Sequence, residues 1–198
     1  MTCRLMLTVL LIATLTACAT TVLETEATSP ALLDARSLGM TQPLMGAAGA
    51  VITVVFSSTD CPIANALAPE LERIHRDFEQ AGSRMLLVHA RSDLDASAAA
   101  AHAGQYGFSM PVLIDSELAL ARALGVVVTP EAVVLRFTER DRWTVVYQGR
   151  VNDLYVALGK RRAAATSHDL RRAIDAALAN RPIDFEPVPA VGCVIEGL

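Results

Sequence analysis

Cys61 is the residue of this sequence best placed to do covalent chemistry. It closely follows a run of strand-forming residues, Val51–Ser57, and is followed at once by Pro62 and an amphipathic stretch, so it lies where a strand leads into a helix. A thiol in the first turn of a helix faces unpaired backbone N–H groups and the positive end of the helix dipole, and both favour the thiolate. Because the thiolate is the nucleophilic form of cysteine, the sequence favours redox chemistry at Cys61.

The other cysteines narrow this interpretation. An early arginine and the apolar run Leu5–Leu15 predict a secretory signal that is too short to span a bilayer permanently. The signal ends in Leu-Thr-Ala-Cys, which resembles the lipobox of bacterial lipoproteins, so we expect cleavage after residue 17 and a lipid on Cys18; an ordinary cleavage site is the alternative. Cys61 and Cys193 then remain as thiols in an exported chain, where disulfides can persist.

The sequence divides into four parts. Residues 1–17 are the predicted signal peptide, 18–45 the lipid anchor and tether, 46–180 the folded domain, and 181–198 a tail that carries Cys193. Beyond the signal we expect the chain to contact the membrane through its lipid only, facing the periplasm. Ala19 stands where some sorting signals have aspartate, and by that resemblance the outer membrane is favoured. The formal net charge of −4 gives no basic excess for binding nucleic acid.

Periodicity in the folded part predicts an α/β domain. Apolar residues recur on one helical face after Pro62, whereas Val51–Ser57 is a continuous apolar run typical of a buried strand. The predicted order is β-α-β-α-β-α-β-β-α, which gives a central mixed sheet flanked by helices on both faces. The predicted strands are 51–57, 84–90, 110–114, 132–137 and 143–148, and the predicted helices are 62–80, 95–106, 117–124 and 167–180, with Ser167 as a cap.

Three features, in the same order, resemble the thioredoxins. Cys61 follows a buried strand and opens a helix. Ala68-Pro69 lies where thioredoxins carry an Ala-Pro pair within that helix, and Thr129-Pro130 resembles the cis-proline loop that faces their active site. The resemblance implies a thioredoxin-like fold in which Thr129 and Pro130 present their backbone to an extended substrate segment.

The predicted site also departs from that of thioredoxin. Ala64 stands where the second cysteine of Cys-x-x-Cys would be, and Val55 takes the place of the buried acid. Asp60, next to the nucleophile, opposes thiolate formation by its charge. The chain more closely resembles the redoxin branch (the alkyl hydroperoxide reductase and thiol-specific antioxidant superfamily), whose exported members have Cys-Pro-x-x-Asn and often end in a Gly-Cys tail, here residues 192–193. The resemblance to the thioredoxin-like fold covers residues 46–180.

These observations predict a thiol–disulfide oxidoreductase. Cys61 is the expected nucleophile and Cys193 the expected resolving thiol, with Pro130 facing them. The expected partner is a protein disulfide or dithiol, or a redox protein, in the periplasm. No cofactor is implied, because the electrons reside in the thiols. The residues expected to contact the substrate are Ser58, Asp60, Pro62 and Thr129.

The sequence leaves a peroxidase open as an alternative. Peroxiredoxins use Pro-x-x-x-Thr/Ser-x-x-Cys together with an arginine that polarises the peroxide. Ser58 matches the hydroxyl position, but Val54 replaces the proline. Arg136 and Arg150 are the candidates for the arginine.

Two further alternatives need no redox turnover. The chain could keep the fold as a membrane-tethered binding module, with Cys61 and Cys193 joined in a structural disulfide. Metal delivery is the other, but Asn65 stands where the copper chaperones of this fold have a second cysteine, and the histidines lack ligand spacing, so no metal ligand is assigned.

Overall fold

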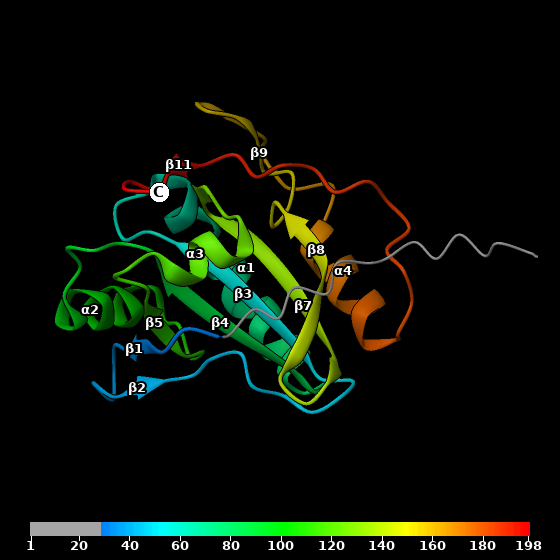
Figure 1. Ribbon diagram of the computed structural model, residues 1–198. Helices are drawn as coiled ribbons and strands as arrows, with labels where there is room; N and C mark the ends of the chain where they lie inside the picture. The colour runs from blue at the N-terminus through cyan, green and yellow to red at the C-terminus, as the bar shows by residue number, and fades with distance from the viewer. Residues whose placement is uncertain (1–28) are drawn as a thin grey trace, which may run out of the picture.

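The computed structural model describes residues 29–198 (Figure 1). The predicted signal peptide at 1–17 and the predicted lipid anchor at Cys18 lie outside the described residues. Within them, no helix is both long enough and apolar enough to cross a membrane.

A seven-stranded mixed sheet forms the centre of the protein, in the order β2-β1-β5-β4-β3-β7-β8. Its three inner strands β5, β4 and β3 run parallel, while β1, β7 and β8 run antiparallel to their neighbours. The strands of this sheet are β1 (Leu32–Asp34), β2 (Met40–Thr41), β3 (Val51–Ser57), β4 (Ser83–His89), β5 (Val112–Ile114), β7 (Glu131–Glu139) and β8 (Arg142–Gly149).

Helices cover both faces of the sheet, as the sequence predicts. Residues of α1, α2 and α4 share one buried cluster with Val55 of β3, and residues of α3 share the other with Val54 and Phe56. Because successive strand residues point to opposite faces, every residue of β3 is buried, and its sequence is almost entirely apolar. The helices are α1 (Pro62–Glu79), α2 (Ala96–Tyr106), α3 (Ala119–Leu124) and α4 (Asp169–Leu178).

Two short two-stranded sheets lie outside the central one. One pairs β9 (Tyr155–Ala157) with β10 (Lys160–Arg161), and the other pairs β6 (Val128–Thr129) with β11 (Cys193–Val194). The chain leaves α4 and crosses the molecule to reach β11, which lies beside β6 (Figure 1). The tail, residues 181–198, therefore contains a short paired strand.

The structure differs from the sequence-based expectation before β3 and at the start of α4. Residues 32–41, assigned to the tether, form β1 and β2 at one edge of the sheet. Arg36 in that segment donates hydrogen bonds to the carbonyl oxygens of Met110 and Phe108, which ties the edge to the chain before β5. The last helix begins at Asp169 after His168, so Ser167 is not its cap and instead donates a hydrogen bond to Asp169.

The β1 edge should contribute measurably to stability. Leu32 is 3% exposed, so Leu32→Ala should lower the free energy of unfolding by about 2–4 kcal/mol through lost burial and the cavity left behind. Leu38 is 68% exposed, and Leu38→Ala should change it by less than about 0.5 kcal/mol. Urea unfolding of the two variants measures both values, and equal effects would show that β1 is not part of the folded unit.

Candidate active site

Cys61 lies at the N-terminus of α1, as its position in the sequence predicts. It is the residue before the helix, with extended backbone angles of φ −82° and ψ 112°, and Pro62 fills the first helical position. Pro62 suits this position because its missing N–H would have no partner there. The side chain of Cys61 is only 1% exposed, and its Sγ donates to the carbonyl oxygen of Thr129 at 3.2 Å.

The Thr129–Pro130 peptide bond is cis, the form that the resemblance to thioredoxins implies. Thr129 is buried and ends β6, directly opposite Cys61. The loop thus presents the carbonyl oxygen of Thr129 to the Cys61 thiol, and the backbone of β6 offers an edge with which another strand can pair.

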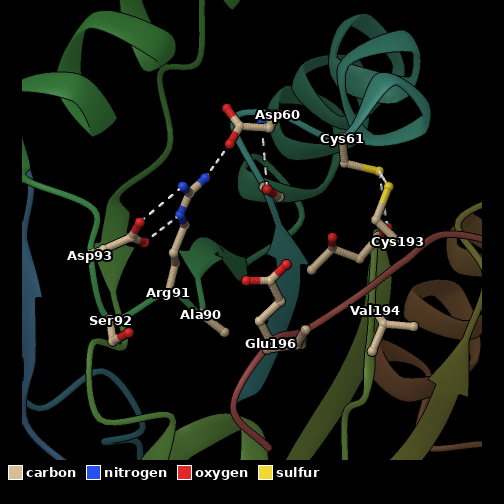
Figure 2. Close-up of a pocket in the computed structure, with 12 residues that line it drawn as sticks. Asp60, Cys61, Ala90, Arg91, Ser92, Asp93, Cys193, Val194 and Glu196 are labelled. Atoms are coloured by element: carbon tan, nitrogen blue, oxygen red, sulfur yellow. Dashed lines mark hydrogen bonds and ion pairs between the residues drawn. The ribbon is translucent and has the colours of Figure 1, made fainter.

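Cys193 occupies that strand edge. It pairs with Thr129 in the register of β6 and β11, and its Sγ lies 2.6 Å from the Sγ of Cys61. Figure 2 shows the two sulfur atoms facing each other at one end of the pocket. The structure therefore brings together the two thiols and the proline loop, although 132 positions separate the cysteines in sequence.

The Cys193 thiol is held in its protonated form by its surroundings. Burial, and then the adjoining Cys61 sulfur, raise the pKa of Cys193 to about 11. Cys193 therefore keeps its proton at neutral pH, and its Sγ donates a hydrogen bond to the Sγ of Cys61.

A pocket of about 440 Å³ opens beside the thiols. Arg91 lies between Asp60 and Asp93 at its rim and forms ion pairs with both (Figure 2). The hydrogen bond from Arg91 holds the pKa of the Asp60 carboxyl below its usual range. The pocket is lined by Ser58, Asp60, Cys61, Ala90, Arg91, Ser92, Asp93, Thr129, Cys193, Val194, Ile195 and Glu196.

All four predicted contact residues lie in or beside the pocket. Ser58, Asp60 and Thr129 line it, and Pro62 follows Cys61 with its ring exposed. The carboxylate of Asp60 points toward Arg91 rather than toward the thiols (Figure 2). The positive charge of Arg91 thus compensates the negative charge of Asp60. Arg91 follows β4 whereas Asp60 follows β3, so their distance in sequence does not indicate this ion pair.

Neither arginine considered for a peroxide site lines the pocket. Arg136 pairs with Val51, at the end of β3 away from Cys61, and Arg150 forms an ion pair with the buried Asp169. Arg91 is the arginine beside the thiols, and two carboxylates already engage it. Neither Arg136 nor Arg150, the two candidates of the peroxidase alternative, therefore lies where it could polarise a peroxide in this pocket.

Three polar side chains, of Asn65, His89 and His102, support the segment before Cys61. Asn65 donates to the Thr59 carbonyl oxygen at 2.9 Å, and its Oδ1 contacts Nε2 of His102, also at 2.9 Å. His89 packs edge-on against His102 with ring centroids 5.2 Å apart, and its Nδ1 lies 3.2 Å from the Ser57 carbonyl oxygen. These side chains fix two backbone carbonyls of the segment that leads to Cys61.

No group of three or more His, Cys, Asp or Glu side chains in residues 29–198 is arranged to hold a metal ion. His89 and His102 are near neighbours, but the ring nitrogens that have partners contact a backbone carbonyl and an amide. The chemistry that this arrangement supports is that of two adjacent thiols beside a strand edge.

Comparison with known sequences identifies the family. The sequence model of the Redoxin family matches residues 23–171, about three quarters of the chain. This chain belongs to the Redoxin family. No curated protein matches the sequence.

Solved structures share the thioredoxin-like fold of this redoxin. An uncharacterized conserved protein from Geobacillus kaustophilus has a TM-score of 0.71 at 20% identity, covering 87% of this chain and 91% of its own. A hypothetical protein from Sinorhizobium meliloti has a TM-score of 0.68 at 24% identity, covering 84% and 89%. A secreted disulfide oxidoreductase from Mycobacterium tuberculosis has a TM-score of 0.53 at 18% identity, covering 75% and 96%. Family and fold together support a thiol oxidoreductase in general terms.

Acid should destabilise this redoxin through His89. Burial, and then His102, lower the pKa of His89 from 6.5 to about 4. Between these two pH values His89 is protonated in the unfolded chain but neutral in the folded chain. The free energy of unfolding should therefore fall by about 3 kcal/mol as the pH drops from roughly 6.5 to 4.

Urea unfolding over this pH range, on wild type and His89→Leu, tests the assignment. The His89→Leu variant should show a flatter pH dependence, whereas His168→Gln, at an exposed position, should keep the wild-type slope. Identical slopes in wild type and His89→Leu would assign the acid sensitivity to other groups.

Proposed function

We propose that this redoxin is an exported thiol–disulfide oxidoreductase in which Cys61 is the nucleophile and Cys193 the resolving thiol. The observation that carries the proposal is the 2.6 Å separation of the two sulfur atoms beside the carbonyl oxygen of Thr129. Two thiols so placed can close a disulfide between them with little movement of the backbone. The Redoxin match and the thioredoxin-like fold support the same chemistry.

The proposed cycle moves two electrons from the cysteine pair to a substrate disulfide. The Cys61 thiolate attacks one substrate sulfur, forming a mixed disulfide and releasing the other substrate sulfur as a thiolate that takes up a proton. Cys193, after losing its proton, attacks Sγ of Cys61, which releases the second substrate thiol and forms the Cys61–Cys193 disulfide. A dithiol reductant then returns the pair to its starting state.

The tail must move for this cycle to begin. Cys61 is 1% exposed, and Cys193 and Thr129 cover its sulfur. No helix or strand lies between α4 and β11 among the described residues, but the Val188 carbonyl oxygen accepts a hydrogen bond from the Arg150 N–H. The four residues 189–192 beyond it, roughly 14 Å when extended, can swing Cys193 away and back while the rest of the tail stays in place. The tail thereby supplies the second thiol that Ala64 does not.

We place the protein outside the cytoplasm, on the periplasmic side of a membrane and held there by a lipid on Cys18. The signal-like residues 1–17 and the lipobox-like sequence support this placement. A structural relative from Mycobacterium tuberculosis is described as secreted, which agrees with export.

Separate substitutions of the two cysteines should give different outcomes. Cys61→Ser should abolish disulfide reductase activity measured with dithiothreitol as the electron donor. Cys193→Ser should instead accumulate a mixed disulfide between Cys61 and the substrate, detected by mass spectrometry, because the resolving step is lost. Circular dichroism controls for folding, and full activity in Cys61→Ser would show that the mechanism is wrong.

The reduction potential of the pair should separate turnover from a structural role. Residues 1–17 would be absent from the purified protein, and its free thiols would be counted by alkylation after equilibration in glutathione buffers. We expect a reversible bridge with a potential above about −270 mV, in the range of working oxidoreductases. A bridge that resists reduction below roughly −300 mV would make it a structural staple and favour a binding module.

A further inference from the structure

The C-terminal tail occupies the edge where a substrate segment would pair. β11 runs antiparallel to β6, with Cys193 opposite Thr129 and Val194 opposite Val128. The next residue, Ile195, donates its N–H to the Val127 carbonyl oxygen at 2.9 Å. This is the addition of an extended segment to an exposed strand edge, the mode by which many proteins bind peptides.

Glycine is the only residue type that fits at position 192 in this pairing. A Cβ atom on Gly192 would lie 2.1 Å from the Thr129 carbonyl oxygen and 2.5 Å from its carbon, both parts of the backbone. Gly192 does not have a positive φ, so the requirement comes from close approach and not from backbone conformation. The residue before the tail cysteine therefore has to be glycine for the segment to reach β6.

The two residues after Cys193 have opposite surroundings. Val194 is 75% exposed, so its side chain is not selected. Ile195 is 5% exposed and belongs to the buried cluster that includes Leu118 and Val126. The second position after the cysteine is thus anchored in an apolar site on the α3 face.

Any cysteine that exchanges with Cys61 has to bring its sulfur to the place that the Cys193 sulfur fills, because the remaining surroundings of Cys61 are closed. We propose that the substrate is an extended protein segment of the form Gly-Cys-Xaa-aliphatic, which displaces residues 192–195 and pairs with β6 in the same register. This proposal rests on the proposed function and adds to it a rule for substrate choice.

The tail then competes with the substrate for one edge. It is tethered to the same chain, so its effective concentration is high, and a substrate binds only while the tail is detached. After the mixed disulfide has formed, the return of the tail to β6 brings Cys193 to Cys61 and expels the product segment. The same movement of the tail therefore displaces the product segment and brings Cys193 into position for the resolving step.

Peptides test the rule on the full chain carrying Cys3→Ser, Cys18→Ser and Cys193→Ser, which leaves Cys61 as its single cysteine, so that exchange stops at the mixed disulfide. The reference peptide, Ala-Val-Gly-Cys-Val-Ile-Glu-Gly, copies residues 190–197, and its cysteine is activated as a disulfide with thionitrobenzoate. Attack by Cys61 on the peptide sulfur releases one coloured thionitrobenzoate for each mixed disulfide formed. The variants replace the glycine before the cysteine by alanine, the valine after it by aspartate, or the isoleucine by aspartate.

The alanine and isoleucine-to-aspartate peptides should react about tenfold more slowly than the reference, because one meets Thr129 and the other loses its apolar anchor. The valine-to-aspartate peptide carries the same charge at the exposed position and should react within about twofold of the reference. Rates that agree within about twofold for all four peptides would overturn the rule.

A small activated disulfide, the glutathione–thionitrobenzoate adduct, separates this failure from failure of the proposed function. Reaction with this adduct without preference among the peptides would overturn the rule alone. No reaction with the adduct or with any peptide would overturn the oxidoreductase and the rule together.

Release of the tail provides a second readout. Adding Ile195→Asp to the Cys193→Ser chain should raise the rate with the reference peptide about tenfold, since the tail then loses its anchor and frees the edge. Leu158→Asp introduces the same charge at an exposed position between β9 and β10 and should leave the rate unchanged. Circular dichroism verifies folding, and an unchanged rate in the Ile195→Asp chain would show that the tail and the peptide do not share a site.

Discussion

The backbone of Thr129 is the point on which the site depends. Its carbonyl oxygen accepts from the Cys61 thiol, and its strand pairs with Cys193, so one residue positions both sulfur atoms. The position of Thr129 follows in turn from β7, which starts directly after Pro130 and pairs with β3 in the middle of the sheet. The central sheet therefore positions Cys61 through α1, and it positions β6, with which the segment of Cys193 pairs. Cys193 itself lies on the tail, which follows α4 and is not a strand of the central sheet.

Much of the fold could be predicted from the sequence because its strongest signals are local. The continuous apolar run of β3 and the apolar spacing of α1 fix these elements to within a residue or so, and with them the position of Cys61. The short strands are different. β1, β2 and β11 have only two or three residues each, and their pairing is decided by partners far away in sequence, such as Thr129 for Cys193. A pattern that needs several residues to show a period cannot reveal them.

The same reason limits what the sequence says about the surroundings of the thiols. Cys61, Cys193 and Pro130 can be recognised by residue type and by resemblance. Arg91 carries no distinguishing pattern in sequence, and His89 is marked only by its position at the end of a predicted strand. They reach the site because β4 lies beside β3 and its C-terminal end opens at the same edge. The buried pair of His89 and His102 also joins β4 to α2, a contact that no spacing along the chain indicates. Topology, and not composition, assembles this part of the site.

The replacement of the local second cysteine by Ala64 changes what oxidation does to the whole chain. A disulfide within the first turn of a helix would close a ring of four residues, but a bond from Cys61 to Cys193 spans 132 positions, two thirds of the 198-residue sequence. In the chain-entropy model a ring of this size restricts the unfolded ensemble enough to add about 4–5 kcal/mol to the free energy of unfolding. Each transfer of two electrons would therefore form or break a cross-link between residues 61 and 193. The free energy of unfolding would be higher in the oxidised protein than in the reduced one.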